Sequence, residues 1–239
     1  MMTEKVVLVT GSTGHLGPAV VRRLAADFNL LALHYFSNLE KAEALRREIE
    51  KSGRQVEIFQ ADLGSEEGAA DLIRRVQEGF GRLDVLVNIP GAIRTRPWDQ
   101  LDRNDWEDIF RSNLESSYFC LKHALPGMRA KKWGRVINIG FHLVEHLGSF
   151  PGVTPYAVAK TGLLILTRTA AVAEVENNIT VNMVSPGLIE GGEISPSLKV
   201  KEGQLGRAED VAEAVAFLAS ERAGKITGTN LIVAGTWKM

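Results

Sequence analysis

A tyrosine and a lysine four positions apart, Tyr156 and Lys160, are the residues whose types and spacing could move a proton. They begin an apolar stretch of helical composition, where this separation puts both side chains on one face of a helix. A tyrosine with a pKa of about 10 is a poor base at neutral pH, but a neighbouring ammonium group favours the phenolate and lowers that pKa. The pair therefore predicts proton transfer to or from an alcohol oxygen, although the same spacing also arises by chance.

Three glycines spaced by two residues each follow the first apolar run of the chain. Such a turn lets the backbone approach a pyrophosphate, and the helix that starts there offers free N–H groups and the positive end of its dipole. Because the turn comes directly after a buried strand, it predicts dinucleotide binding. The residues of this predicted site are Thr10, Gly11, Ser12, Thr13, Gly14, His15, Leu16 and Gly17.

The end of the second strand normally distinguishes NAD from NADP, because a carboxylate there bonds the ribose hydroxyls and repels a 2′-phosphate. This chain has His34, Tyr35, Ser37 and Asn38 at that point, with neither an acid nor an arginine. The pattern favours NADP, with NAD as the alternative, and a merely polar strand end would look the same. Asp62, after the third strand, is placed to bond the adenine amino group or to cap a helix.

Strand and helix patterns alternate along the whole chain and must position these residues. Apolar runs typical of buried strands occupy 5–10, 30–35, 56–60, 83–88, 135–140, 179–185 and 231–233. Helical spacing or composition occupies 16–26, 40–51, 66–79, 104–129, 154–175 and 208–220. Alternation without a linker predicts one α/β domain over residues 1–239: a Rossmann fold with a doubly wound parallel sheet and helices on both faces.

Composition excludes several other classes of protein. With 28 basic and 29 acidic residues the net charge is −1, which gives no electrostatic reason to bind nucleic acid or a membrane surface. No apolar run approaches the ~18 residues of a membrane span. The single cysteine, Cys120, fits a reducing compartment and a buried apolar position. Since Lys5 leads at once into an apolar strand and leaves no room for a signal peptide, we expect a cytoplasmic protein.

Residues 142–146 spell H-x-x-E-H, a pattern of zinc proteases. That pattern needs a long helix, whereas here it lies in a predicted loop closed by Gly148 and Pro151. We therefore expect no metal site.

Several motifs, taken in order, resemble those of the short-chain dehydrogenase/reductase family over nearly the whole chain. They are the glycine turn 10–17, Ala61-Asp62-Leu63, Asn88-Ile89-Pro90-Gly91, Asn113, Tyr156 with Lys160, Val184-Ser185-Pro186-Gly187, Leu205-Gly206-Arg207 and Ile226-Thr227-Gly228. Within the family the chain is most similar to 3-oxoacyl-acyl-carrier-protein reductases. His34-Tyr35 and the glycine turn are also similar to those of pteridine reductases.

The resemblance implies a role for each catalytic residue. Tyr156 would protonate the carbonyl oxygen, Lys160 would hold the nicotinamide ribose, and Asn113 would anchor a water that links Lys160 to solvent. Further implied cofactor contacts are Asp62 and Leu63, then Asn88, Pro90 and Gly91 on the adenosine side, and Pro186 and Gly187 beside the nicotinamide.

The chain also departs from the family pattern. His15 stands where the turn usually has its middle glycine, Gly191 replaces a common threonine, and the substrate lid near 188–206 is short. Phe141 occupies the place of the catalytic serine, whose hydrogen bond to the reacting oxygen is worth about 10²–10³ in rate. Either His142 or Ser149 replaces that donor, or the substrate differs as in pteridine reductases, or the protein binds cofactor without efficient turnover.

The expected function is reduction of a small carbonyl substrate, a 3-oxoacyl-type ketone that is free or bound to a carrier protein. The alternatives are a pteridine-reductase-like enzyme and a dinucleotide-binding sensor or partner protein with weak catalysis. Arg94 and Arg96 could meet an acidic substrate or carrier, although exposed loop arginines usually have no such role. Residues 163–173 are apolar almost all round a helix, which predicts a homodimer or homotetramer.

Overall fold

The computed structural model describes residues 3–192 and 205–235, and in this part of the chain seven parallel strands form one sheet. Their order is β3-β2-β1-β4-β5-β6-β7. The strands are β1 (Thr3–Thr10), β2 (Phe28–Tyr35), β3 (Gln55–Gln60), β4 (Val85–Asn88), β5 (Gly134–Ile139), β6 (Ile179–Pro186) and β7 (Asn230–Val233). Strands β4, β5 and β6 are buried along their whole length, as expected where both faces are covered.

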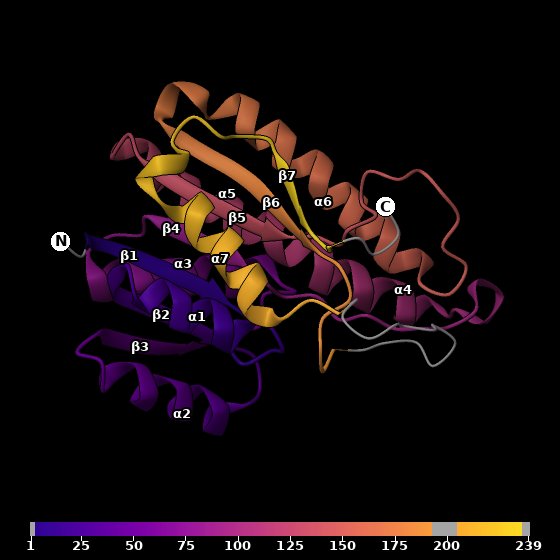
Figure 1. The fold of residues 1–239 in the computed structure, drawn as a ribbon, viewed down its shortest axis with the longest axis horizontal. Coiled ribbons are helices and arrows are strands. Elements are labelled where there is room, and N and C mark those ends of the chain that lie inside the picture. Colours follow the sequence, from indigo (N-terminus) through magenta and orange to yellow (C-terminus); the bar gives the residue numbers. More distant parts are fainter. Residues whose placement is uncertain (1–2, 193–204, 236–239) are drawn as a thin grey trace.

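Helices pack on both faces of the sheet, which confirms the predicted doubly wound α/β fold. One face contacts α1 (Gly17–Ala25), α2 (Leu39–Glu50) and α7 (Ala208–Ala219). The other contacts α3 (Glu66–Phe80), α5 (Ser116–Ala130) and α6 (Thr154–Ala173). Figure 1 shows α1 and α7 in front of the sheet and α3 and α5 behind it.

The carboxyl ends of the central strands are level with one another. Thr10 of β1 pairs with Asn88 of β4, which pairs with Asn138 of β5. Buried amides tie the strands together, since Asn88 Nδ2 donates to Asn138 Oδ1 at 2.9 Å and Asn138 Nδ2 donates to Thr167 Oγ1 at 2.9 Å. The strand order reverses between β1 and β4, which is where open α/β sheets bind ligands. At this end, Figure 1 shows α4 (Arg103–Phe110) and the loop of residues 141–153.

The expected long helix over 104–129 is not continuous, so that prediction is wrong in detail. Helix α4 is followed by a π-helical turn, Arg111–Glu115, before α5 begins. Side chains in the turn compete for main-chain carbonyls: Ser112 Oγ donates to Asp108 O at 2.8 Å, and Asn113 Nδ2 donates to Ile109 O at 3.0 Å. π-Turns of this kind often mark functional sites.

The predicted lid near 188–206 lies in part outside the described residues, which omit 193–204. Its two ends meet, because Ile189 and Gly206 form a parallel bridge and Gly206 N–H donates to Leu188 O at 2.8 Å. Among the helices that the structure describes, none is long and apolar enough to cross a membrane.

Candidate active site

Tyr156 and Lys160 lie in the first two turns of α6, on the same side of the helix. The Nζ atom of Lys160 is 5.9 Å from the centre of the Tyr156 ring. Lys160 is 2% exposed and donates a hydrogen bond to the carbonyl oxygen of Ile139 at 2.7 Å. The predicted pair is thus present, with the amine anchored to the end of β5.

Burial changes the pKa values of both groups. It raises the pKa of the Tyr156 hydroxyl above its usual value of 10.0 and lowers the pKa of Lys160 from 10.5 to about 7. The expected lowering of the tyrosine pKa by the lysine is therefore not met in this structure. The physical reason is that desolvation opposes the phenolate, while the lysine itself loses much of its preference for the charged form.

Asn113 presents a free acceptor beside this pair. Its Nδ2 atom donates to Ala92 O at 2.8 Å, whereas Oδ1 is buried and accepts no hydrogen bond from the described residues. A Cβ added at Gly91 would lie 2.2 Å from Asn113 Oδ1 and 3.0 Å from Lys160 Nζ. Glycine at this position therefore allows both polar groups to approach the same point of the backbone, which a side chain there would prevent.

The glycine turn fits a dinucleotide. Gly11 has a φ of +66°, which disfavours other residues, and a Cβ at Gly17 would lie 2.3 Å from the Ser12 carbonyl oxygen. Gly14 N–H donates to Gly11 O at 3.0 Å and closes the turn at the start of α1. Because these positions lack a Cβ, the backbone segments of the turn can approach one another closely. The amino end of α1 then remains accessible to a pyrophosphate.

His34 supports this turn from beneath. Its Nδ1 atom accepts the Gly11 N–H at 3.0 Å, and its Nε2 atom lies 3.1 Å from Ala61 O. Burial lowers the pKa of His34 to about 4, which keeps the ring neutral. Ser12 is also buried and donates its hydroxyl to His34 O at 3.0 Å. Both residues are predicted cofactor contacts, but their polar side-chain atoms already bond to the protein and shape the turn.

The end of β2 and the loop after β3 form the expected adenosine side. Asn38 caps α2, because its Oδ1 accepts the Lys41 N–H at 2.9 Å. Asp62 accepts the Gly64 N–H at 2.9 Å, and its other oxygen lies 3.4 Å from Arg111 Nη2. Arg111 is the residue that sequence reasoning missed here. Nothing in the local pattern signals it, since tertiary packing brings the π-turn to the loop after β3.

The other predicted cofactor contacts lie around the same edge. Pro90 packs against Gly11, whose added Cβ would be 3.3 Å from Pro90 N, and Gly187 N–H donates to Val233 O at 2.9 Å. The remaining members of the set occupy the turn or strand ends: Thr10, Thr13, His15, Leu16, Tyr35, Ser37, Leu63, Asn88 and Pro186.

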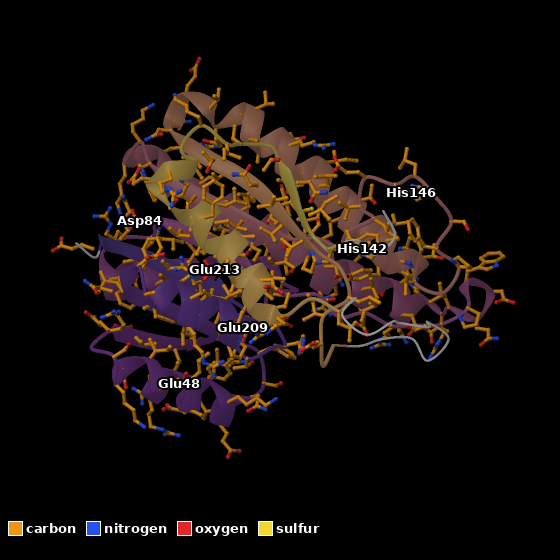
Figure 2. The ribbon with its side chains drawn as sticks, in the orientation of Figure 1. Glu48, Asp84, His142, His146, Glu209 and Glu213 are labelled. Atoms are coloured by element: carbon orange, nitrogen blue, oxygen red, sulfur yellow. The ribbon has the colours of Figure 1, made fainter. Side chains whose placement is uncertain are left out.

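An aromatic cluster borders Tyr156. The Phe141 ring lies 5.4 Å from the Tyr156 ring and 5.8 Å from the Phe150 ring, centre to centre. His142 follows Phe141 and donates its backbone N–H to Pro186 O at 2.9 Å, whereas Ser149 is exposed. Figure 2 shows His142 near the base of the loop and His146 farther out along it. In the described part of the chain no group of three or more His, Cys, Asp or Glu side chains could hold a metal ion.

Arg94 and Arg96 are engaged within the protein. Both donate to the carboxylate of Asp105, which is 2% exposed at the start of α4; the Arg94 contact measures 2.8 Å. The backbone N–H of Arg96 also donates to Gly152 O at 2.9 Å, in the loop that precedes Tyr156. Residues 92–96, named the strap below, therefore connect Asn113, α4 and this loop.

A protein-family profile described as enoyl-(acyl carrier protein) reductase matches residues 12–236 of the chain. The chain belongs to the short-chain dehydrogenase/reductase family. The resemblance found in the sequence is thereby confirmed. Membership places the protein among oxidoreductases that use nicotinamide dinucleotides.

Relatives of this short-chain dehydrogenase/reductase align over its full length. It is 35% identical over 246 residues to the 3-oxoacyl-[acyl-carrier-protein] reductase FabG of Haemophilus influenzae, with 98% of each chain covered. It is 30% identical over 244 residues to nodulation protein G of Azospirillum brasilense, again covering 98% of each. A solved structure provisionally named a short-chain alcohol dehydrogenase, from Sinorhizobium meliloti, is 28% identical with a TM-score of 0.89, covering 98% of this chain and 96% of that one.

Proposed function

We propose that this short-chain dehydrogenase/reductase reduces the carbonyl group of a small substrate to an alcohol, with Tyr156 as the general acid. The observation that carries the proposal is the pairing of Tyr156 with Lys160, whose Nζ lies 5.9 Å from the Tyr156 ring and bonds Ile139 O at the carboxyl end of β5. A nicotinamide dinucleotide bound at the turn would supply the hydride. Tyr156 would donate its proton to the carbonyl oxygen, and its raised pKa keeps that proton available.

Lys160 and Asn113 would return a proton to Tyr156 after each turnover. The supporting observation is that Asn113 Oδ1 and Lys160 Nζ both lie close to Gly91, within 2.2 and 3.0 Å of where a Cβ would be. A water there would accept a hydrogen bond from Lys160 and donate one to Asn113 Oδ1, which is buried and has no partner in the described residues. Lys160, with a pKa of about 7, can both accept and release a proton near neutrality.

We propose NADP as the preferred cofactor, with NAD as the alternative. Neither an acid nor an arginine is present at residues 34–38, where β2 ends, and Ser37 offers a hydroxyl donor there. Support for a 3-oxoacyl-type substrate, free or bound to a carrier protein, comes from the similarity to the Haemophilus reductase. The residues 1–239 would form one NAD(P)-binding domain with its substrate lid near 188–206, and the cytoplasm remains the expected compartment.

We also propose that the protein works as a homodimer or homotetramer through α6. Val158, Ile165 and Val172 recur every seven residues and are 46%, 64% and 78% exposed. They form an apolar stripe on the side of α6 that faces away from the sheet, the α6 stripe. Tyr118 of α5, 42% exposed, adds to the same kind of surface.

The decisive experiment separates binding from turnover. Titrations of NADPH and NADH by fluorescence come first, followed by cofactor oxidation with a β-ketoacyl thioester, a diketone, a quinone and a pterin. Tyr156→Phe is the control. We expect tighter binding of NADPH and turnover that depends on Tyr156. Tight binding without such turnover would instead favour a sensor or partner protein. This is the second candidate function because Phe141 occupies the place of the catalytic serine. Failure to bind either dinucleotide would contradict both.

A further inference from the structure

The ring of Phe141, a hydrocarbon without polar atoms, lies next to the ring of Tyr156. Phe141 lies 5.4 Å from Tyr156 with the two rings inclined at 57°, and Phe150 meets Phe141 edge to face at 78°. Phe141 packs against the small apolar cluster that includes Val144, Leu163 and Met183. This packing fixes a flat apolar wall beside the proposed proton donor.

The wall offers the reacting oxygen no donor of its own. Tyr156 supplies a hydroxyl, whereas the Phe141 ring has no hydrogen to donate. Lys160 Nζ already donates to Ile139 O, and Ser149 is exposed on the loop. His142 directs its backbone N–H to Pro186 O, and its ring meets the Phe141 ring edge to face at 6.0 Å. Removal of one donor from a developing oxyanion typically costs about 10²–10³-fold in rate.

A substrate can compensate for that loss when its own structure stabilises the developing charge. In an α-dicarbonyl compound the second carbonyl group withdraws electrons from the reacting carbon and stabilises the alkoxide that forms. A conjugated α-dicarbonyl is also flat, and flat π-systems stack well on aromatic side chains. A simple ketone lacks the second carbonyl group that stabilises the alkoxide.

We propose that the substrates of this protein are carbonyl compounds activated by an adjacent carbonyl group, which lie against Phe141 while Tyr156 alone donates to the reacting oxygen. This inference rests on the proposed reductase function. The nicotinamide dinucleotide gives up a hydride, with two electrons, to one carbonyl carbon and is oxidised. The C=O π-bond breaks, and its oxygen takes the proton of Tyr156. Solvent then reprotonates Tyr156, so the net product is a hydroxyketone.

The test compares two probes with the same skeleton, 1-phenyl-1,2-propanedione and propiophenone, which lacks the second carbonyl. In Phe141→Ser the added hydroxyl should raise kcat/KM for propiophenone by about 10²–10³-fold and for the diketone only a few-fold. Phe141→Ala is the matched control, because it opens the same space without adding a donor. Equal effects of the two variants, or a wild-type enzyme that reduces both probes at similar rates, would overturn the proposal. Melting temperatures of both variants check their folding.

A second readout does not depend on turnover. The infrared stretching frequency of carbonyl-labelled propiophenone, bound with oxidised cofactor, falls as donors to its oxygen are added. We expect a single-donor shift in the wild type and a larger shift in Phe141→Ser. A two-donor shift in the wild type that His142→Leu removes would show that His142 replaces the missing donor, and this inference would be wrong. If no probe oxidised NADPH but the infrared shift still corresponded to one donor, the proposed reductase function would be contradicted. The inference that a single donor contacts the oxygen would stand.

Discussion

The Nζ atom of Lys160 lies 2.7 Å from the carbonyl oxygen of Ile139, the last residue of β5. A backbone carbonyl accepts a hydrogen bond from either an ammonium or a neutral amine. The contact therefore holds Lys160 in place in both protonation states. Since burial lowers its pKa to about 7, this lysine can exchange protons near neutrality without moving away from Tyr156.

The lowered pKa of Lys160 predicts a pH-dependent stability. Between about pH 7 and pH 10.5 the unfolded chain binds a proton at this residue that the folded protein does not, so the free energy of unfolding should rise with pH over that interval. Lys160→Met should flatten the rise. Urea midpoints of the cofactor-free protein across the interval measure the effect, and Lys41→Met, at an exposed position, is the control. Parallel curves for wild type and Lys160→Met would contradict the prediction.

Tyr156→Phe should reduce the rate of carbonyl reduction about 10²–10⁴-fold, because it removes the proposed general acid. Cofactor affinity should stay unchanged, since the glycine turn is untouched. The raised pKa of Tyr156 also predicts that the wild-type reduction rate does not fall through deprotonation of Tyr156 until above pH 10.0, the ordinary tyrosine pKa. Stopped-flow traces of NADPH oxidation measure both effects. Tyr118→Phe, at an exposed tyrosine, should behave as wild type.

Asp105 should control the order of the active-site loop through the strap. Its buried carboxylate joins Arg94 and Arg96, and Arg96 N–H bonds Gly152 O. Asp105→Asn removes the charge and should lower the free energy of unfolding, because hydrogen bonds to an ionised carboxylate are stronger than those to a neutral amide. Hydrogen exchange should speed up in residues 92–101 and 141–153, with no change in β1. Asp108→Asn, whose half-exposed carboxylate also meets Arg94, should have little effect. Equal exchange in both variants would exclude the strap as a positioning element.

The parts of this protein that follow a local pattern could be predicted from the sequence. The strands are short apolar runs, and the glycine turn and the Tyr156–Lys160 spacing depend only on neighbouring residues. The surroundings of Asn113 could not be predicted in this way, because its Nδ2 atom also bonds Ala92 O, 21 positions away.

Burial explains most of the remaining differences. The pKa of Tyr156 was expected to fall beside a lysine, but desolvation raises it, and desolvation depends on how the whole chain packs. His34 was expected to face a cofactor, whereas its ring nitrogens meet Gly11 N–H and Ala61 O. Arg94 and Arg96 were expected to be exposed loop residues. In the structure both donate to Asp105, which α4 positions beside them.

His34 predicts a loss of stability in acid. Its pKa is lowered to about 4 from 6.5, so as pH falls through that interval the unfolded chain takes up a proton that the folded protein does not. His34→Leu should remove this acid-dependent loss and, by leaving Gly11 N–H without its acceptor, cost about 1–3 kcal/mol at neutral pH. Chemical denaturation measures stability, and NADPH titration should show weaker binding. His146→Leu, which changes an exposed histidine, is the control. If His34→Leu bound the cofactor as tightly as the wild type, His34 would have no role in cofactor binding by the glycine turn.

The α6 stripe predicts the assembly state. Ile165→Glu places a charge in the middle of three exposed apolar side chains, and burying an unpaired charge in an interface is strongly unfavourable. We expect the variant to elute as a monomer in size-exclusion chromatography with light scattering, while the wild type elutes as a dimer or tetramer. Leu39→Glu, at a 51% exposed position on α2, is the matched control and should leave the mass unchanged. A wild-type monomer, or an Ile165→Glu variant with the mass of the wild type, would show that subunits do not associate through this stripe.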